Sequence, residues 1–209
     1  METYREPALA VSESDIVLLC VDPKHVGDVL KEISYAARGR VVVSTAARVP
    51  LAQLHRFLEG SEDVEVFRAV PNINVEVNKG FTALAGAGRS ARVVEELFSL
   101  LGDVVWIDEE LMDAITVAGA CLPALVAEIM DAVIVAATRL GIPKRLVYRL
   151  VARVFEGTAL SVLEHGASRV RDSVASPGGV TSRMLMKALE KNVKYVVAST
   201  IVETLSESP

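Results

Sequence analysis

Residues 15–45 read DIVLLCVDPKHVGDVLKEISYAARGRVVVST, and an apolar run stands at each end of this stretch. The runs, 15–21 and 40–45, lack the alternation of a half-exposed strand, and apolar residues between 26 and 33 recur at helical spacing. A strand, a helix and a second strand in this order predict a βαβ unit. Its strands are expected to be parallel and buried on both faces.

The same alternation of strands and helices continues to residue 107, and it stops there. Further strands are predicted at 64–70, 81–85 and 104–107, with helices at 51–58 and 93–101 between them. Only helical patterns follow, at about 109–140, 144–164, 180–190 and 194–205. We therefore predict an α/β domain over 1–108 and an all-α domain over 109–209.

Charge and composition exclude several classes of partner. The net charge of the 209 residues is −5 and no basic block occurs, which argues against nucleic acid. The longest uncharged apolar run, 114–127, is too short to span a membrane, and Pro123 interrupts it. No apolar segment of signal-peptide type follows Met1, so a cytoplasmic location is expected.

Cysteine and histidine patterns give no sign of a metal site. Cys20 and Cys121 lie in apolar segments without ligand spacing, and both are expected to be reduced core residues. The three histidines are scattered along the chain. We therefore predict no metal.

The stretch 171–181, RDSVASPGGVT, precedes an apolar helical pattern. Two glycines after a proline let backbone N–H groups turn toward one point, and the unpaired N–H groups of a helix start attract anions. A capped connection between two helices explains the same residues. Both interpretations stay open at this point.

A second glycine pattern, Gly86-Ala87-Gly88-Arg89-Ser90-Ala91, matches the G-x-G-x-x-A fingerprint of dinucleotide sites. Asp108 lies about 20 residues further on, as that fingerprint requires. However, only one βαβ unit precedes the helical domain here, so we favour a glycine-eased turn between a strand and a helix.

Six motifs resemble those of the pyrroline-5-carboxylate reductase family, and they occur in the family's order. They are DIVLLCVDP (15–23), VSTAA (43–47), RAVPN (68–72), GFTAL (80–84), MDAIT (112–116) and SPGGVT (176–181). The resemblance covers essentially the whole chain. It implies a Rossmann-like parallel sheet domain, truncated here, followed by an all-α dimerisation domain.

The resemblance also implies a reaction and a set of sites. The family reduces 1-pyrroline-5-carboxylate to proline with NADP or NAD as the cofactor. Thr116 would place its hydroxyl near the imine nitrogen, although a threonine inside a helix often bonds its own backbone. The substrate would contact Pro123, Ala124, Ser176, Gly178, Gly179 and Thr181. The nicotinamide side would be lined by Val21, Pro23, Ala46, Ala47, Pro71 and Asn72, of which Pro71-Asn72 could be only a strand-ending turn.

The chain departs from the family at its start. Only fourteen residues precede Asp15, whereas a βαβ unit needs about 30. The Gly-rich turn that holds the pyrophosphate is therefore missing, which counts against binding of the whole dinucleotide. We assign 15–21 to strand 3 of the order 3-2-1-4-5-6. With strands 1 and 2 removed it has no neighbour, so we expect it to slide and pair directly with strand 4 at 40–45, or a partner chain to fill the gap.

Other departures lie in the motifs themselves. Arg48 and Leu122 stand where the family has glycine, Asp22 stands for a lysine and Leu125 for a tyrosine. Two function classes follow. The chain is either a reductase of 1-pyrroline-5-carboxylate or a non-catalytic paralogue that binds a small carboxylate. In both cases the apolar segment around 114–137 predicts a homodimer or higher oligomer.

Overall fold

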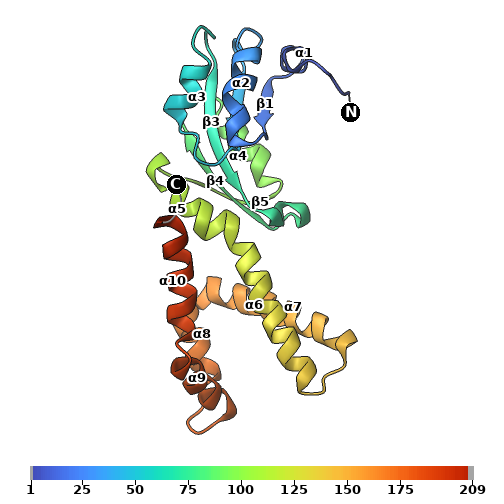
Figure 1. Cartoon of the computed structure of the whole chain (residues 1–209), viewed down its shortest axis with the longest axis vertical. Coiled ribbons are helices and arrows are strands. Elements are labelled where there is room, and N and C mark those ends of the chain that lie inside the picture. Colours follow the sequence, from blue (N-terminus) through green and yellow to red (C-terminus); the bar gives the residue numbers. More distant parts are fainter. Residues whose placement is uncertain (1, 207–209) are drawn as a thin grey trace. The chain divides into compact units, whose positions relative to one another are not determined.

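A computed structural model describes residues 2–206, which form a five-stranded sheet followed by helices (Figure 1). The chain divides into two compact units, Met1–Pro123 and Ala124–Pro209. The described strands all belong to the first unit, and the described part of the second unit is helical. The predicted fold class, a Rossmann-like α/β domain followed by an all-α domain, is confirmed.

The first unit alternates strands and helices, as the apolar pattern predicts. Its elements are α1 (Pro7–Ser12), β1 (Ile16–Leu19), α2 (Pro23–Ile33), β2 (Val41–Ser44), α3 (Leu51–Phe57), β3 (Glu65–Pro71), the 3₁₀ helix η1 (Ile73–Val77), β4 (Gly80–Gly86), α4 (Ala91–Ser99), β5 (Gly102–Trp106), the 3₁₀ helix η2 (Glu109–Leu111), α5 (Met112–Ile115) and the π-helix η3 (Thr116–Cys121). Helix α1 and the two 3₁₀ helices add to the predicted set, because segments this short leave no periodic signal.

The strands are ordered β1-β2-β3-β4-β5 in one sheet. β1 pairs in parallel with β2, with Ile16 opposite Val41, so the predicted direct pairing of these two segments is confirmed. In the order 3-2-1-4-5-6, successive strands are neighbours from strand 4 onward. β1, β2 and β3 reproduce this part of the order. No strand therefore has to slide across a gap, and the assignment of 15–21 to strand 3 is corrected.

The sheet is mostly parallel, with one exception. β2 and β3 are parallel, β3 and β4 are antiparallel, and β4 and β5 are parallel again. Helix α4 connects β4 to β5, as a parallel crossover requires.

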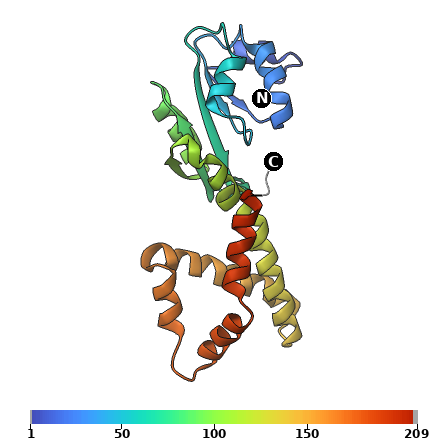
Figure 2. The same cartoon turned by 60° about the vertical axis from the view of Figure 1, so that its left-hand side comes forward.

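Helices cover both faces of the sheet (Figure 2). On one face Val42 packs in a cluster with Leu30 of α2 and Leu54 of α3. On the other face Phe67 packs in a cluster with Phe98 of α4. Because alternate residues of a strand point to opposite faces, both sets are buried, and this explains why the strands read as continuous apolar runs.

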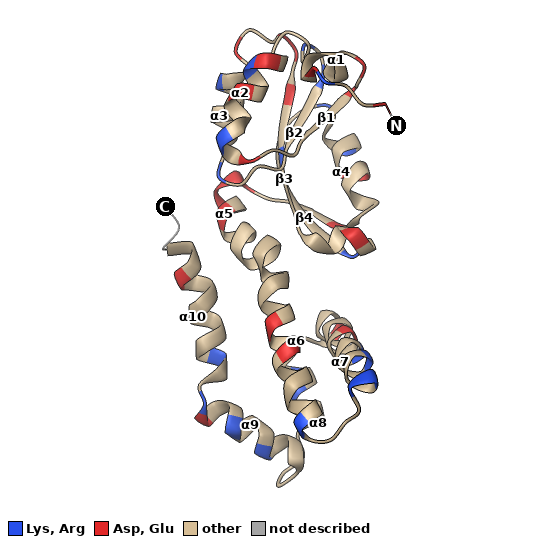
Figure 3. Ribbon diagram, turned by 45° about the vertical axis from the view of Figure 1, so that its right-hand side comes forward, with Lys and Arg blue, Asp and Glu red and all other residues tan. Residues whose placement is uncertain are grey.

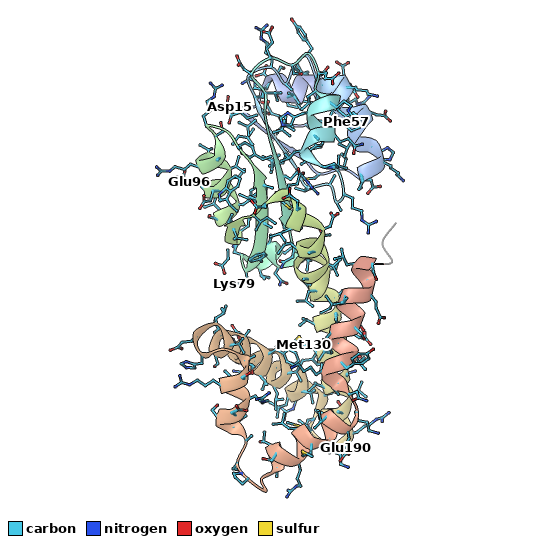
Figure 4. The ribbon with its side chains drawn as sticks, turned by 90° about the vertical axis from the view of Figure 1, so that its left-hand side faces the viewer. Asp15, Phe57, Lys79, Glu96, Met130 and Glu190 are labelled. Carbon is cyan, nitrogen blue, oxygen red and sulfur yellow. The ribbon has the colours of Figure 1, made fainter. Side chains whose placement is uncertain are left out.

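Helices α2 and α3 approach closely at a glycine. A Cβ atom on Gly27 would lie 3.0 Å from the ring of Phe57, which Figure 4 labels. The ammonium of Lys31 lies 5.7 Å from the centroid of the same ring. The missing side chain at Gly27 therefore lets an aromatic ring close the layer over the sheet.

The second unit consists of helices. They are the greater part of α6 (Leu122–Arg139), followed by α7 (Lys144–His165), α8 (Ala167–Val174), α9 (Val180–Glu190) and α10 (Val193–Ser206). Helix α8 was not predicted, because it is short and rich in charge. A small core joins α6 and α7 through Ala137, Val147 and Val151, and Met130, labelled in Figure 4, packs against it.

Residues Glu109–Arg139 form one helix that is long and apolar enough to cross a membrane by length and composition. The shortness of the uncharged run 114–127 is therefore no argument against a membrane span. Of the 18 most apolar consecutive residues of this helix, only 6% are buried within the chain. Val133 and Val135 are 39% and 45% exposed. Figure 3 shows that few charged residues interrupt α6. An exposed apolar surface of this kind is typical of an interaction site.

Two further predictions concern single residues and the domain boundary. Cys20 and Cys121 are both exposed, so the expectation that they belong to the core is wrong. Cys20 follows the edge strand β1, whose Leu18 is also exposed. The sheet ends at Trp106 and the next helix begins at Glu109, while the two compact units meet after Pro123. A boundary after residue 108 stays a prediction.

Candidate functional site

The carboxyl ends of β1, β2 and β3 lie at one edge of the sheet, because these three strands are parallel. The predicted nicotinamide-side residues are Val21 and Pro23 after β1, Ala46 and Ala47 after β2, Pro71 at the end of β3, and Asn72 directly after it. Open α/β sheets bind ligands at this edge. The structure thus brings the six residues to the edge where a ligand would bind, and their contact with a cofactor stays a prediction.

The loop after β2 contains a left-handed residue. Arg48 has φ +61°, a conformation that costs a non-glycine residue about 1–2 kcal/mol. Ala46, two residues before it, and Val49, directly after it, are buried. The backbone here has the shape that suits the glycine of the family motif, although the chain carries arginine.

Asn72 connects three segments of the first unit. Its Oδ1 accepts hydrogen bonds from the backbone N–H of Asn74 at 3.2 Å and of Phe81 at 3.4 Å. Its Nδ2 donates to the carbonyl of Gly119 at 3.4 Å. An α-helix would satisfy that carbonyl through residue 123, but Pro123 has no N–H. Asn72 thus supplies a donor that the helix lacks.

Thr116 begins the π-helix η3, and π-helical turns are frequent at functional sites. Its hydroxyl donates to the carbonyl of Met112 at 2.8 Å. The local backbone bond expected of a helical threonine is therefore present. Because the hydroxyl hydrogen is engaged, Thr116 Oγ1 can offer only its lone pairs to a ligand.

An ion pair that no local pattern reveals lies on β3. Arg68 Nη1 donates to Glu109 Oε1 at 2.9 Å, and the same oxygen accepts the backbone N–H of Leu51 at 2.6 Å. The Arg68 side chain is 4% exposed. Since the two charged residues are 41 positions apart, no periodicity or motif could have paired them.

The glycine turn 86–91 is filled by a carboxylate of the chain itself. Glu65 accepts hydrogen bonds from the backbone N–H of Ser90 at 2.8 Å and from Arg89 Nε at 2.8 Å. A Cβ on Gly88 would lie 2.2 Å from Glu65 Oε2. The absence of a side chain at Gly88 leaves the space that the Glu65 carboxylate occupies. The turn between β4 and α4 holds this carboxylate where a dinucleotide site would hold phosphate.

Burial alone would raise the pKa of Glu65. The hydrogen bonds from Ser90 and Arg89, together with the Arg89 charge, outweigh this effect, and the pKa lies below its ordinary value of 4.5. Glu65 is therefore ionised at neutral pH and occupies the turn as an anion.

The loop 176–181 lies in the second unit and leads into α9. Gly178 has φ +72°, and a Cβ on Gly179 would lie 2.4 Å from Ser176 Oγ. A side chain of α9 holds the loop, because Arg183 Nη1 donates to the carbonyl of Gly178 at 3.1 Å. Gly179 is the N-cap, and no side chain caps this end of α9. Part of the helix start is thus left to other acceptors.

A hollow of about 380 Å³ adjoins this loop. Gly178, Ser182, Arg183, Met186, Lys187 and Glu190 line it. Lys187 pairs with Glu190 at 3.3 Å, so one of the two cations is already compensated within the hollow. The surroundings of the loop suit a small anion.

The predicted catalytic residue, Thr116, and the predicted substrate-binding residues are divided between the two units. Thr116 and Pro123 lie in the first, while Ala124, Ser176, Gly178, Gly179 and Thr181 lie in the second. Ala124 lies in the first turn of α6, next to Pro123. Within residues 2–206, no cluster of His, Cys, Asp or Glu could hold a metal ion.

Two family models match the chain. Residues 109–208 match the pyrroline-5-carboxylate reductase dimerisation family, and residues 3–48 match the family of NADP oxidoreductases that depend on coenzyme F420.

Curated relatives carry the name pyrroline-5-carboxylate reductase. The Corynebacterium melassecola protein is 31% identical over 88% of this chain and 72% of its own length. The Synechocystis protein is 32% identical over 82% of this chain and 66% of its own length. The Methanosarcina acetivorans protein is 29% identical, and the alignment covers 96% of this chain and 76% of the relative. The chain thus spans about two thirds to three quarters of these relatives.

Solved structures share the fold. Plasmodium falciparum pyrroline carboxylate reductase with NADP bound has a TM-score of 0.89 at 21% identity, over 98% of this chain and 79% of that one. The 1-pyrroline-5-carboxylate reductase of Streptococcus pyogenes has a TM-score of 0.83 at 25% identity, over 95% of this chain and 77% of that one. The likeness includes both the sheet and the helices.

Proposed function

Because the chain belongs to the pyrroline-5-carboxylate reductase family, we propose that it reduces 1-pyrroline-5-carboxylate to proline with NADPH or NADH. The observation that carries this proposal is the extent of the relationship. It extends over the carboxyl edge of the sheet, where the predicted nicotinamide-side residues lie, and over the glycine loop before α9.

The reaction forms a C–H bond at the imine carbon while the C=N double bond becomes a single bond. Bound reduced nicotinamide supplies the hydride. The ring nitrogen keeps the proton that it carries in the iminium form, so the product is a neutral amine. Protonation makes the carbon more electrophilic, and a group that favours the iminium ion therefore lowers the barrier.

Thr116 would act on the nitrogen as an acceptor. Since its hydrogen is given to Met112, the hydroxyl oxygen accepts the N–H of the iminium ion and cannot donate to a neutral imine. The loop Ser176–Thr181 would hold the carboxylate through open N–H groups at the start of α9. Pro123 and Ala124 would pack against the ring.

The cofactor residues fit one end of the dinucleotide. Ala46 and Ala47, with the neighbouring Val21, Pro23, Pro71 and Asn72, offer a mostly apolar edge with one amide, which suits a nicotinamide ring. The turn 86–91 is not part of this site, because β4 is antiparallel to β3 and its end therefore lies at the opposite edge of the sheet, where Glu65 fills the turn. The six residues of the apolar edge would orient the nicotinamide ring and exclude water from it.

The test is NADPH oxidation in the presence of 1-pyrroline-5-carboxylate, followed at the nicotinamide absorbance. We expect Thr116→Val to lower kcat/KM about 100-fold, the usual scale for a group that assists proton chemistry. The matched control is Thr138→Val, since Thr138 makes the same backbone bond to Ile134 at 2.8 Å. Equal losses in the two variants would contradict the role of Thr116.

A second candidate is a dimeric protein that binds a small carboxylate without catalysis. Arg48 and Leu122 favour it, because each places a side chain where the family has glycine. Calorimetry with proline and a nicotinamide fluorescence titration separate the two candidates. Binding of proline with no binding of NADPH or NADH, and no turnover, would support the binding protein.

A further inference from the structure

The buried cation on β3 is unusual for a strand in a core. Arg68 stands between Val66 and Val70 on one face of the strand. Val66 belongs to the cluster under α2 and α3, and Val70 belongs to the cluster under α5 and η3. Arg68 therefore lies where these two apolar clusters meet.

Only one nitrogen of the guanidinium has a partner. Nη1 bonds Glu109, whereas Nε and Nη2 are buried without a hydrogen-bond partner. These two atoms form the side-on fork of the guanidinium, which normally binds two oxygens. A buried charge with unpaired donors contributes little to stability, and apolar residues of similar volume would serve a core at least as well. The arrangement calls for another explanation.

Glu109 joins two segments of the proposed site. Its Oε1 binds the N–H of Leu51, the first residue of α3, and that N–H has no partner within the helix. The loop 45–50 directly precedes Leu51. On the other side, Glu109 begins the helix that continues through the fully buried Met112 to Thr116.

We propose that Arg68 and Glu109 are a positioning pair, which holds the loop 45–50 at a fixed place relative to the helix that carries Thr116. This inference rests on the proposed function, because the loop contains Ala46 and Ala47 of the nicotinamide side. Arg68 fixes the carboxylate of Glu109, and that carboxylate fixes the end of the loop. The left-handed Arg48 lies within the held segment, so the pair also retains a backbone shape that is strained by itself.

The test compares Arg68→Met, Arg68→Lys and Glu109→Gln with the wild-type chain. We expect Arg68→Met to raise the KM for NADPH and the Kd of NADPH at least tenfold, with a smaller effect on the KM for 1-pyrroline-5-carboxylate. Arg68→Lys restores a single charged contact and is expected to recover part of the loss. Arg92→Met is the matched control, because Arg92 pairs with Glu96 in an exposed i,i+4 contact.

Hydrogen exchange gives a readout that does not depend on activity. In Arg68→Met and Glu109→Gln, amides of 45–51 are expected to exchange at least tenfold faster, while amides of β3 and β4 keep their protection. If Arg68→Met does not fold, Glu109→Gln, which keeps shape and volume, decides alone. The positioning role would be overturned if amide exchange rose equally throughout the first unit, or did not rise at all. It would also be overturned if the amides of 45–51 exchanged faster while the Kd of NADPH stayed unchanged.

The two proposals fail in different ways. If the wild-type chain binds no NADPH and shows no turnover, the proposed reductase function fails. The exchange pattern in 45–51 then still decides whether the pair positions the loop.

Discussion

At the scale of single residues, Gly179 and Gly157 have different roles. Gly179 admits the hydroxyl and carbonyl of Ser176, because a Cβ would lie 2.4 Å and 3.1 Å from these atoms. Gly157, inside α7, has nothing within 4 Å of the same position. One glycine shapes the loop, and the other only lowers the propensity of its helix.

We therefore expect opposite outcomes for two alanine substitutions. Gly179→Ala should displace the loop before α9 and weaken proline binding more than tenfold in calorimetry. Gly157→Ala should leave binding unchanged and raise the free energy of unfolding by about 0.5–1 kcal/mol, the helix preference of alanine over glycine. Unchanged proline binding in Gly179→Ala would remove the loop from the proposed site.

At the scale of elements, the position of β3 could be predicted from the sequence, but its side-chain contacts could not. Its apolar run predicts a strand, and the predicted 64–70 differs from the observed Glu65–Pro71 by one residue at each end. The same run does not reveal that Arg68 meets Glu109 or that Glu65 enters the turn before α4, because both contacts depend on tertiary structure. The π-helix is likewise hidden, although Pro123 marks a missing donor nearby.

Glu65 makes the stability of the first unit depend on pH. Its pKa is lowered on folding, so its contribution is fully present above the unfolded value of about 4.5 and is lost as pH falls through the folded value. Glu65→Gln should destabilise the chain by about 1 kcal/mol at pH 7, since the bonds to Glu65 are charge-assisted. The difference should shrink toward pH 3 in denaturant melts.

The control for this titration is Glu96→Gln, which breaks an exposed pair with Arg92. Exposed pairs contribute little, so its effect should be small at every pH. A Glu65→Gln difference that stayed constant from pH 7 to pH 3 would contradict the assigned cause.

At the scale of the whole molecule, the family relationship supports a homo-oligomer. The match to the dimerisation family begins at residue 109 and includes the apolar helix. Only 6% of the apolar stretch of this helix is buried within the chain. The apolar segment around 114–137 already predicts an oligomer from the sequence. Which helices contact which could not be predicted, because periodicity says that a face is buried but does not say by what.

A charge on this surface should separate the subunits. We expect Val135→Glu, at a position that is 45% exposed in the single chain, to shift the mass in light scattering from a dimer or larger species to a monomer. Arg153→Glu on α7, at a side chain that is already 73% exposed and charged, serves as a comparison. Persistence of the oligomer in Val135→Glu would place the contact elsewhere.

The carboxylate in the glycine turn has a consequence for selectivity. Glu65 is tethered to a strand that pairs with the sheet, so its effective concentration at the turn exceeds that of any dissolved anion at millimolar levels. Free phosphate or a stray nucleotide must displace a competitor that never diffuses away. The start of α4, although it has the glycines of a phosphate cradle, is therefore closed to the cell's pool of phosphorylated metabolites.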